Sequence, residues 1–97
     1  MWFAIWAVDQ ADKLDLRLAH RQEHRLRLQQ LMDQGRVFCA GPLSDEDVLS
    51  GSLMVLDFPD FASAENWANQ DPYYIHGLYQ RLEIKPWQPV FTSNIGI

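Results

Sequence analysis

Residues 2–8 read WFAIWAV, an apolar and aromatic segment that stops at Asp9. Such a continuous apolar run predicts a β-strand that is covered on both faces. The next segment, from about Asp12 to Gln34, contains no proline or glycine and is rich in leucine, arginine and glutamine. These residues favour a helix, and Gly35 stands where a helix commonly ends on a glycine. The chain therefore opens with a strand and a long helix.

The apolar pattern predicts further regular segments along the rest of the chain. These are strands at residues 37–40 and 51–58, a helix from Asp60 to about Gln70, a short turn at 72–76 and a half-exposed strand at 79–85. Gly41-Pro42 is expected to break the second strand, and a polar loop is expected over residues 43–50. Asp71-Pro72 ends the second helix, because a residue before proline avoids the helical region.

The predicted order is strand, helix, strand, strand, helix, strand. Two strand–helix–strand units joined by a hairpin form an α+β, ferredoxin-like βαββαβ sandwich with an antiparallel sheet. The 97 residues suffice for one domain only, which we place at residues 1–91, followed by a loosely held tail over 92–97. The helices of this fold cover one face of the sheet. A second copy of the chain would cover the other face, so we expect a homodimer.

The overall charge excludes some classes of partner. Thirteen acidic and eight basic residues give a net charge of −5, and an acidic domain binds nucleic acid and anionic membranes poorly. No apolar run is long enough to span a membrane, and no signal peptide is recognisable, which favours a cytoplasmic protein. Four arginines nevertheless cluster within eleven positions and form a candidate anion site. They are Arg17, Arg21, Arg25 and Arg27.

His24 is the first candidate for chemistry. The apolar stripe of the first helix runs through Leu28, Leu31 and Met32, and one turn back it passes through His24. His24 is therefore either a core histidine bonded to the backbone or a general base, which needs a carboxylate to orient its ring. Asp71 is the candidate carboxylate.

Asp71 also has a purely structural interpretation. An aspartate followed by a proline is typical of the N-cap and first position of a helix, which the short turn after it needs. The sequence does not separate the two roles, and one residue can fill both. Asp57, on the third strand, is a second candidate carboxylate. The alternative interpretation is that Asp57 is only an exposed residue at the end of that strand.

Two further pairs of residues are candidates for binding a substrate. Arg17 and Arg21 lie four residues apart and share one helix face. They are either solvated and paired with carboxylates or they line a pocket, where they suit a carboxylate or phenolate ligand. His76 lies one helical turn beyond Asp71, close to Tyr73, and both are candidates for the pocket wall. The alternative is that His76 is a partly exposed turn residue.

A metal site is a weaker hypothesis. His20, Glu23 and His24 match the H-x-x-E-H pattern of one class of zinc peptidases. The pattern has only three fixed positions, and no third protein ligand stands out downstream, so we expect no metal. The single Cys39 excludes an internal disulfide and an all-cysteine zinc site. No phosphate-cradling glycine loop or nucleotide fingerprint is present, so we expect no cofactor.

An ordered set of short motifs resembles the YciI-like (YCII-related) proteins. The motifs are RLAHRQEH at residues 17–24, Gly35-Arg36, Ala40-Gly41-Pro42, Trp67-Ala68, Asp71-Pro72-Tyr73, Gly77-Leu78-Tyr79 and Lys85-Pro86-Trp87. The resemblance covers essentially residues 1–91. It implies a ferredoxin-like fold within the dimeric α+β barrel group, in which two sheets meet face to face.

The resemblance also implies a site centred on a histidine and an aspartate, which fall here on His24 and Asp71. Arg17 matches one of the family's basic positions before the histidine, and Arg21 matches another. The sequence departs from the family pattern at its other two histidines, His20 and His76.

The relatives suggest the class of reaction. One branch of the family is similar to lyases that remove chloride from chlorinated hydroxyquinols, and the wider superfamily includes muconolactone isomerases and small monooxygenases that work without metal or flavin. We therefore expect a cofactor-independent enzyme, of isomerase or lyase type, that acts on a small cyclic or aromatic acid. His24 moves a proton, Asp71 orients it, and Arg17 or Arg21 holds an anionic group. The alternative is a non-catalytic ligand-binding or accessory dimer that uses the same pocket.

Overall fold

The computed structural model describes residues 1–93, so most of the tail predicted over 92–97 lies outside the described residues. The described chain contains four strands and three helices. They are β1 (Trp2–Asp9), α1 (Leu14–Asp33), β2 (Val37–Asp45), β3 (Val48–Asp57), α2 (Phe61–Asn69), α3 (Pro72–Ile75) and β4 (Tyr79–Trp87).

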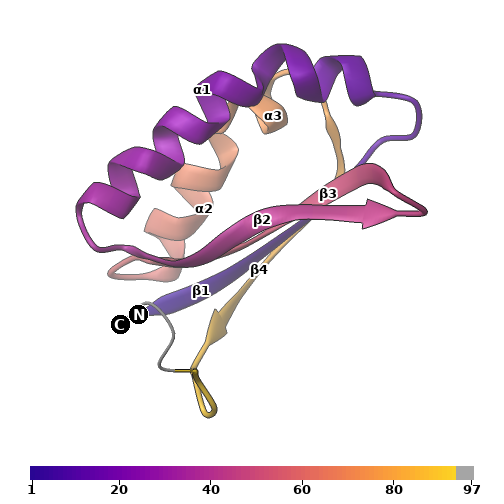
Figure 1. Ribbon diagram of the computed structural model, residues 1–97. Coiled ribbons are helices and arrows are strands. Elements are labelled where there is room, and N and C mark those ends of the chain that lie inside the picture. Colours follow the sequence, from indigo (N-terminus) through magenta and orange to yellow (C-terminus); the bar gives the residue numbers. More distant parts are fainter. Residues whose placement is uncertain (94–97) are drawn as a thin grey trace.

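The four strands form one antiparallel sheet in the order β2-β3-β1-β4. This is the strand order of the ferredoxin-like sandwich, so the predicted α+β fold class is confirmed. Figure 1 shows α1, α2 and α3 together on one side of the sheet, while the described chain places no helix on the other side. Among residues 1–93, no helix combines the length and apolar character that crossing a membrane requires.

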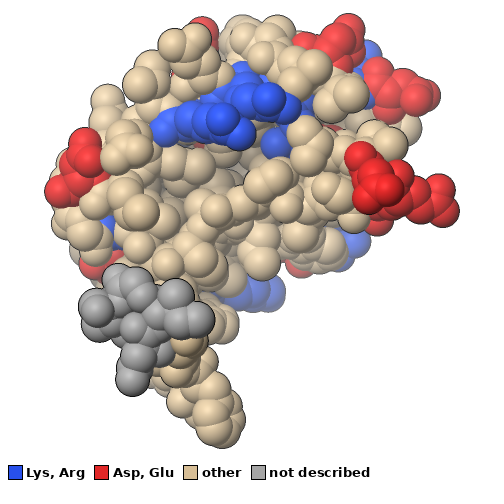
Figure 2. Space-filling view, in the orientation of Figure 1, with Lys and Arg blue, Asp and Glu red and all other residues tan. Residues whose placement is uncertain are grey.

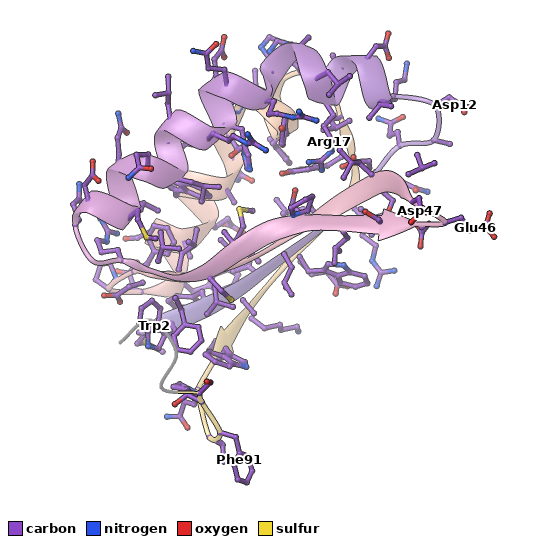
Figure 3. All side chains as sticks on the ribbon, in the orientation of Figure 1. Trp2, Asp12, Arg17, Glu46, Asp47 and Phe91 are labelled. Carbon is purple, nitrogen blue, oxygen red and sulfur yellow. The ribbon has the colours of Figure 1, made fainter. Side chains whose placement is uncertain are left out.

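The β2–β3 hairpin is longer than the sequence predicts. β2 continues through Gly41-Pro42 to Asp45, so the expected break and the expected polar loop over 43–50 are wrong. Proline is tolerated because β2 is an edge strand with a single neighbour. Glu46 and Asp47, labelled in Figure 3, close the hairpin with positive φ angles of 49° and 67°. Positive φ at both central residues is typical of a tight two-residue turn.

The core lies between the helices and one face of the sheet. β1 alternates, with Phe3, Ile5 and Ala7 buried beneath the helices and Trp6 exposed on the opposite face. The predicted covering of β1 on both faces is therefore not met within one chain. The buried apolar cluster consists of Phe3, Ile5, Leu31, Met54, Leu56, Phe58, Ala64 and Ala68.

The buried stripe of α1 is polar at two of its three positions. Arg17, His24 and Leu31 are buried, and their spacing of seven residues is close to two helical turns. Met32, which the sequence places on this stripe, is 57% exposed, because neighbouring helix positions point about 100° apart. α1 therefore presents a guanidinium and an imidazole to the interior, and both need buried polar partners there.

The sheet face opposite the helices carries aromatic and apolar side chains. Phe38 contacts Trp2 and Trp87 edge to face, with ring centroids 5.5 and 5.2 Å away. Figure 3 shows Trp2 on this side of the sheet. Further along, Trp6 and its cross-strand partner Leu53 are 37% and 41% exposed. This face, which we call the open face, is uncovered in a single chain.

Candidate active site

His24 and Asp71 meet in the interior. His24 Nδ1 lies 2.7 Å from Asp71 Oδ2, and the two residues are only 6% and 1% exposed. His24 comes from the middle of α1, whereas Asp71 precedes α3. Asp71 Oδ1 also accepts a hydrogen bond of 2.9 Å from the backbone N–H of Tyr73, as the N-cap of α3. One carboxylate thus caps a helix and contacts the histidine at the same time.

The hydrogen bonds define which ring nitrogen of His24 carries a proton. An ionised carboxylate can only accept, so Nδ1 donates to Asp71 and the neutral ring has no proton on Nε2. Within residues 1–93 no hydrogen bond reaches Nε2. The Tyr73 ring stacks on the imidazole, with centroids 4.2 Å apart and planes at 22°, and this contact holds the ring plane. The imidazole is therefore oriented from two sides and has one free acceptor.

Arg27 lies close to the same carboxylate. Its Nη1 is 3.6 Å from Asp71 Oδ2, and its guanidinium stacks over the Trp67 ring at 4.4 Å. Burial lowers the pKa of Arg27, and the charge of Asp71 opposes that effect only in part. Arg27 Nη1 is buried and makes no hydrogen bond in the part of the chain that the structure describes. Asp71 therefore has positive or donating groups on both sides.

A cavity of about 230 Å³ lies beside His24, between α1 and the sheet. Its polar wall contains His24, Tyr73 and three arginines of α1. Its apolar wall contains Leu28 from α1, Pro42 from β2, and Leu49 and Met54 from β3. Figure 2 shows the blue basic side chains gathered in one band over the gap between α1 and β2. The chain is acidic overall, yet its cavity is lined by cations.

Arg17, the first of these arginines, is already paired. It is 4% exposed, and Figure 3 shows it pointing from α1 toward the sheet. Its Nε and Nη2 donate to the two carboxylate oxygens of Asp9 at 2.7 and 2.9 Å, and Nη2 also donates to Ser52 Oγ at 3.0 Å. Burial opposes the charge of Arg17, but the hydrogen bond and charge of Asp9 outweigh it and raise the pKa. The structure thus assigns Arg17 to a buried network that joins α1, β1 and β3.

Arg21 and Arg25 are the arginines with free charge in the cavity wall. Neither makes an ion pair or a hydrogen bond among the described residues 1–93. Arg21 was predicted as a ligand-binding residue. Arg25 was named only within the arginine cluster, although its spacing of four residues from Arg21 is a signal for the same face. Ser52 was missed, because only the register of β3 brings it beneath Arg17.

His76 and Asp57 lie away from the cavity. His76 is exposed at the C-terminus of α3 and stacks on His20, with ring centroids 3.8 Å apart and planes at 8°. Asp57 ends β3, opposite Trp2 in the register, and its backbone carbonyl accepts from Arg36. The structure therefore brings Tyr73, but neither of these two residues, to His24 and Asp71.

The H-x-x-E-H pattern of α1 does not converge on one point. His24 bonds to Asp71, whereas His20 stacks on His76. In the described part of the chain, no group of three or more histidine, cysteine, aspartate or glutamate side chains is placed to hold a metal ion.

The fold and this site together define a ferredoxin-like α+β protein with a buried histidine–aspartate pair beside a cation-lined cavity. The model of the YCII-related domain family matches residues 1–88, and the chain belongs to this family. It is 38% identical over 98 residues to Protein YciI of Escherichia coli O6:H1, covering 94% of this chain and 100% of that one. An uncharacterised protein of Haemophilus influenzae is 37% identical over the same shares of each chain.

Two solved structures share the fold. The 5-chloro-2-hydroxyhydroquinone dehydrochlorinase of Burkholderia phenoliruptrix, in complex with 2,5-dihydroxybenzoquinone, is 20% identical, with a TM-score of 0.81 over 91% of this chain and 94% of that one. An antibiotic biosynthesis monooxygenase is 12% identical, with a TM-score of 0.53 over 92% of this chain and 100% of that one. At these identities the likeness concerns the fold alone.

The Arg17 network predicts unequal effects of two arginine substitutions. Arg17→Met leaves the buried Asp9 carboxylate unpaired and is expected to lower the free energy of unfolding by about 3–5 kcal/mol. Arg21→Met is the control from the same helix face and is expected to change it by about 0.5 kcal/mol or less. Urea unfolding measures both, and adding Asp9→Leu to Arg17→Met should recover part of the loss. Equal effects of the two single changes would contradict the assignment of Arg17.

Proposed function

We propose that the protein is an enzyme that transfers a proton on a small cyclic or aromatic acid, with His24 as the general base. The observation that carries the proposal is the 2.7 Å contact of His24 Nδ1 with Asp71. This contact leaves Nε2 unprotonated on a histidine that lines the cavity. A neutral imidazole with a free Nε2 is the form that accepts a proton from a substrate.

The proposed step uses groups of the chain itself. Nε2 removes a proton from a substrate carbon, and the imidazolium that forms is stabilised by the Asp71 carboxylate. In an isomerisation the same nitrogen returns the proton to another carbon. In an elimination the electron pair of the C–H bond forms a double bond, the bond to the leaving group breaks, and the proton later passes from Nε2 to water. Isomerisation and elimination both need only one base, and His24 supplies it in each case.

The cavity supports a small substrate. A volume of about 230 Å³ corresponds to roughly eight water molecules in the liquid, which suits a single ring with its substituents. The unpaired guanidiniums of Arg21 and Arg25 suit an anionic group, and the apolar wall suits the ring. General base catalysis contributes about 10²–10⁴-fold, so the proton that leaves must already be fairly acidic. The keto tautomer of a hydroxyhydroquinone, the kind of ring in the name of the dehydrochlorinase, has an acidic proton on the carbon next to its carbonyl.

The proposal predicts that His24→Gln separates turnover from binding. Candidate ring acids and chlorinated hydroxyhydroquinones are incubated with the protein in D₂O. Exchange of carbon-bound protons is followed by ¹H NMR, and chloride release is followed with an ion-selective electrode. Wild-type protein should catalyse exchange or release, and His24→Gln should lose about 10²–10⁴-fold of the rate while it keeps ligand affinity within about threefold.

His20→Gln is the matched control, because His20 lies one turn away on the same helix but stacks on His76. It is expected to keep the full rate. If the wild type binds ring acids without exchanging their protons, and His24→Gln changes only the affinity, the enzyme proposal fails. The non-catalytic ligand-binding dimer then becomes the better account.

We also propose that a second copy of the chain covers the open face, which makes the protein a homodimer. On this face Phe38 contacts both Trp2 and Trp87, and Trp6 and Leu53 are exposed. Burying apolar area of this kind is the main driving force of association, and self-complementary pairing about a two-fold axis is the commonest arrangement.

Light scattering behind size exclusion should therefore give twice the chain mass of 11.3 kDa. Leu53→Lys puts a charge in the middle of the open face and is expected to shift the population toward monomer. Leu26→Lys, at a 56% exposed position of α1, is the control and should stay dimeric. A wild-type mass of one chain would refute the homodimer, and dissociation of both variants alike would refute an interface on the open face.

A further inference from the structure

Two of the three arginines that line the cavity have no counter-ion among residues 1–93. Arg17 is neutralised by two hydrogen bonds to Asp9. Arg21 and Arg25 make no ion pair among the described residues, and no aspartate or glutamate belongs to the lining of the cavity. The cavity wall thus carries two guanidiniums that no described carboxylate pairs with, of which Arg21 is half-buried and Arg25 is exposed, in a chain whose net charge is −5. A ligand that pairs with both guanidiniums carries two negative charges.

The spacing of the two arginines separates these charges. Residues four apart on a helix have Cβ atoms about 6 Å from each other on the same face. Each guanidinium presents a planar fork that pairs with one carboxylate through two parallel hydrogen bonds. Two forks side by side therefore match two carboxylates on a short rigid spacer better than they match one carboxylate.

A phosphate group is a poorer match to the same wall. Many protein phosphate sites add free backbone N–H groups of helix N-termini or glycine-rich loops to their cationic side chains. Arg21 and Arg25 lie in the interior of α1, where the backbone N–H groups are bonded within the helix. Gly41, which also lines the cavity, belongs to the ladder between β2 and β3.

We propose that the ligand of this cavity is a dianionic organic acid, with two carboxylates held separately by Arg21 and Arg25. This proposal rests on the proposed function for the ligand's role as the substrate. His24 follows Arg21 by three residues and lines the same cavity, so an acid held by both guanidiniums has its ring beside His24 and Tyr73. The arginine pair then selects the substrate by its charge and holds it against the base.

Calorimetric titration at low salt tests the proposal with three probes, namely benzoate, isophthalate and inorganic phosphate. Isophthalate is expected to bind about fivefold more tightly than benzoate, which is the effect of one added, partly exposed ion pair. Its affinity should also fall more steeply with added salt.

Single substitutions then separate the two charges. In Arg21→Gln and in Arg25→Gln, the affinity for isophthalate should fall about fivefold, to the affinity for benzoate. The affinity for benzoate should fall by no more than about twofold, because one guanidinium remains available to bind it. Arg81→Gln is the control for the loss of one positive charge, since Arg81 pairs with Glu83 on β4 and does not line the cavity. It should leave both affinities unchanged.

Three results overturn the proposal. One is equal affinity for benzoate and isophthalate, and another is phosphate binding as tight as that of isophthalate. The third is the absence of isophthalate binding at about 10 mM. These results are distinct from a failure of the proposed function, because the titrations do not depend on proton transfer by His24. If the protein prefers the dianion but does not catalyse exchange of the ligand's protons, the binding-site proposal stands and the enzyme proposal fails.

Discussion

The Asp71 carboxylate joins the parts of this structure that are far apart in the sequence. One oxygen caps the short helix α3 through the Tyr73 N–H, and the other meets His24 in the middle of α1. The carboxylate is 1% exposed, so its charge is stable only while these donors are in place. Because a single group serves both purposes, the position of α3 and the orientation of the imidazole are coupled. The N-cap of α3 is therefore also the hydrogen-bond partner of the imidazole of His24.

A second buried carboxylate, Asp9, also joins α1 to another element. It holds Arg17 of α1 against β1, and Ser52 of β3 takes the remaining donor. Tyr73 contacts both groups, since its ring stacks on His24 and lies 4.7 Å beneath the Arg17 guanidinium. Polar contacts therefore attach α1 to the sheet beside the cavity, where the apolar core does not fill the space between them. Arg21 and Arg25, which also line the cavity, take no part in these contacts.

The sequence was sufficient for the order of elements and for the residues that meet at the site. Periodicity predicts β1, α1 and β4, and the sequence alone indicates His24 and Asp71 as candidate partners. It does not predict the length of the β2–β3 hairpin, because Gly41-Pro42 is a strong local turn signal. An edge strand tolerates this turn signal, and whether a strand lies at the edge depends on the arrangement of the whole sheet. The sequence leaves open whether Arg17 pairs with a carboxylate or binds a ligand, because its partner Asp9 lies on another element. Local spacing places a side chain on a helix face but does not identify the group opposite it.

The most direct test of this account is the position of the proton on His24, measured by long-range ¹⁵N–¹H NMR at a pH where the ring is neutral. We expect a proton on Nδ1 and none on Nε2 in the wild type. In Asp71→Asn the side-chain oxygen still accepts from the Tyr73 N–H, so the amide NH₂ faces His24 and donates to Nδ1. The ring proton should then move to Nε2. A wild-type ring protonated on Nε2, or a ring whose tautomer ignores the substitution, would contradict the central role given to Asp71.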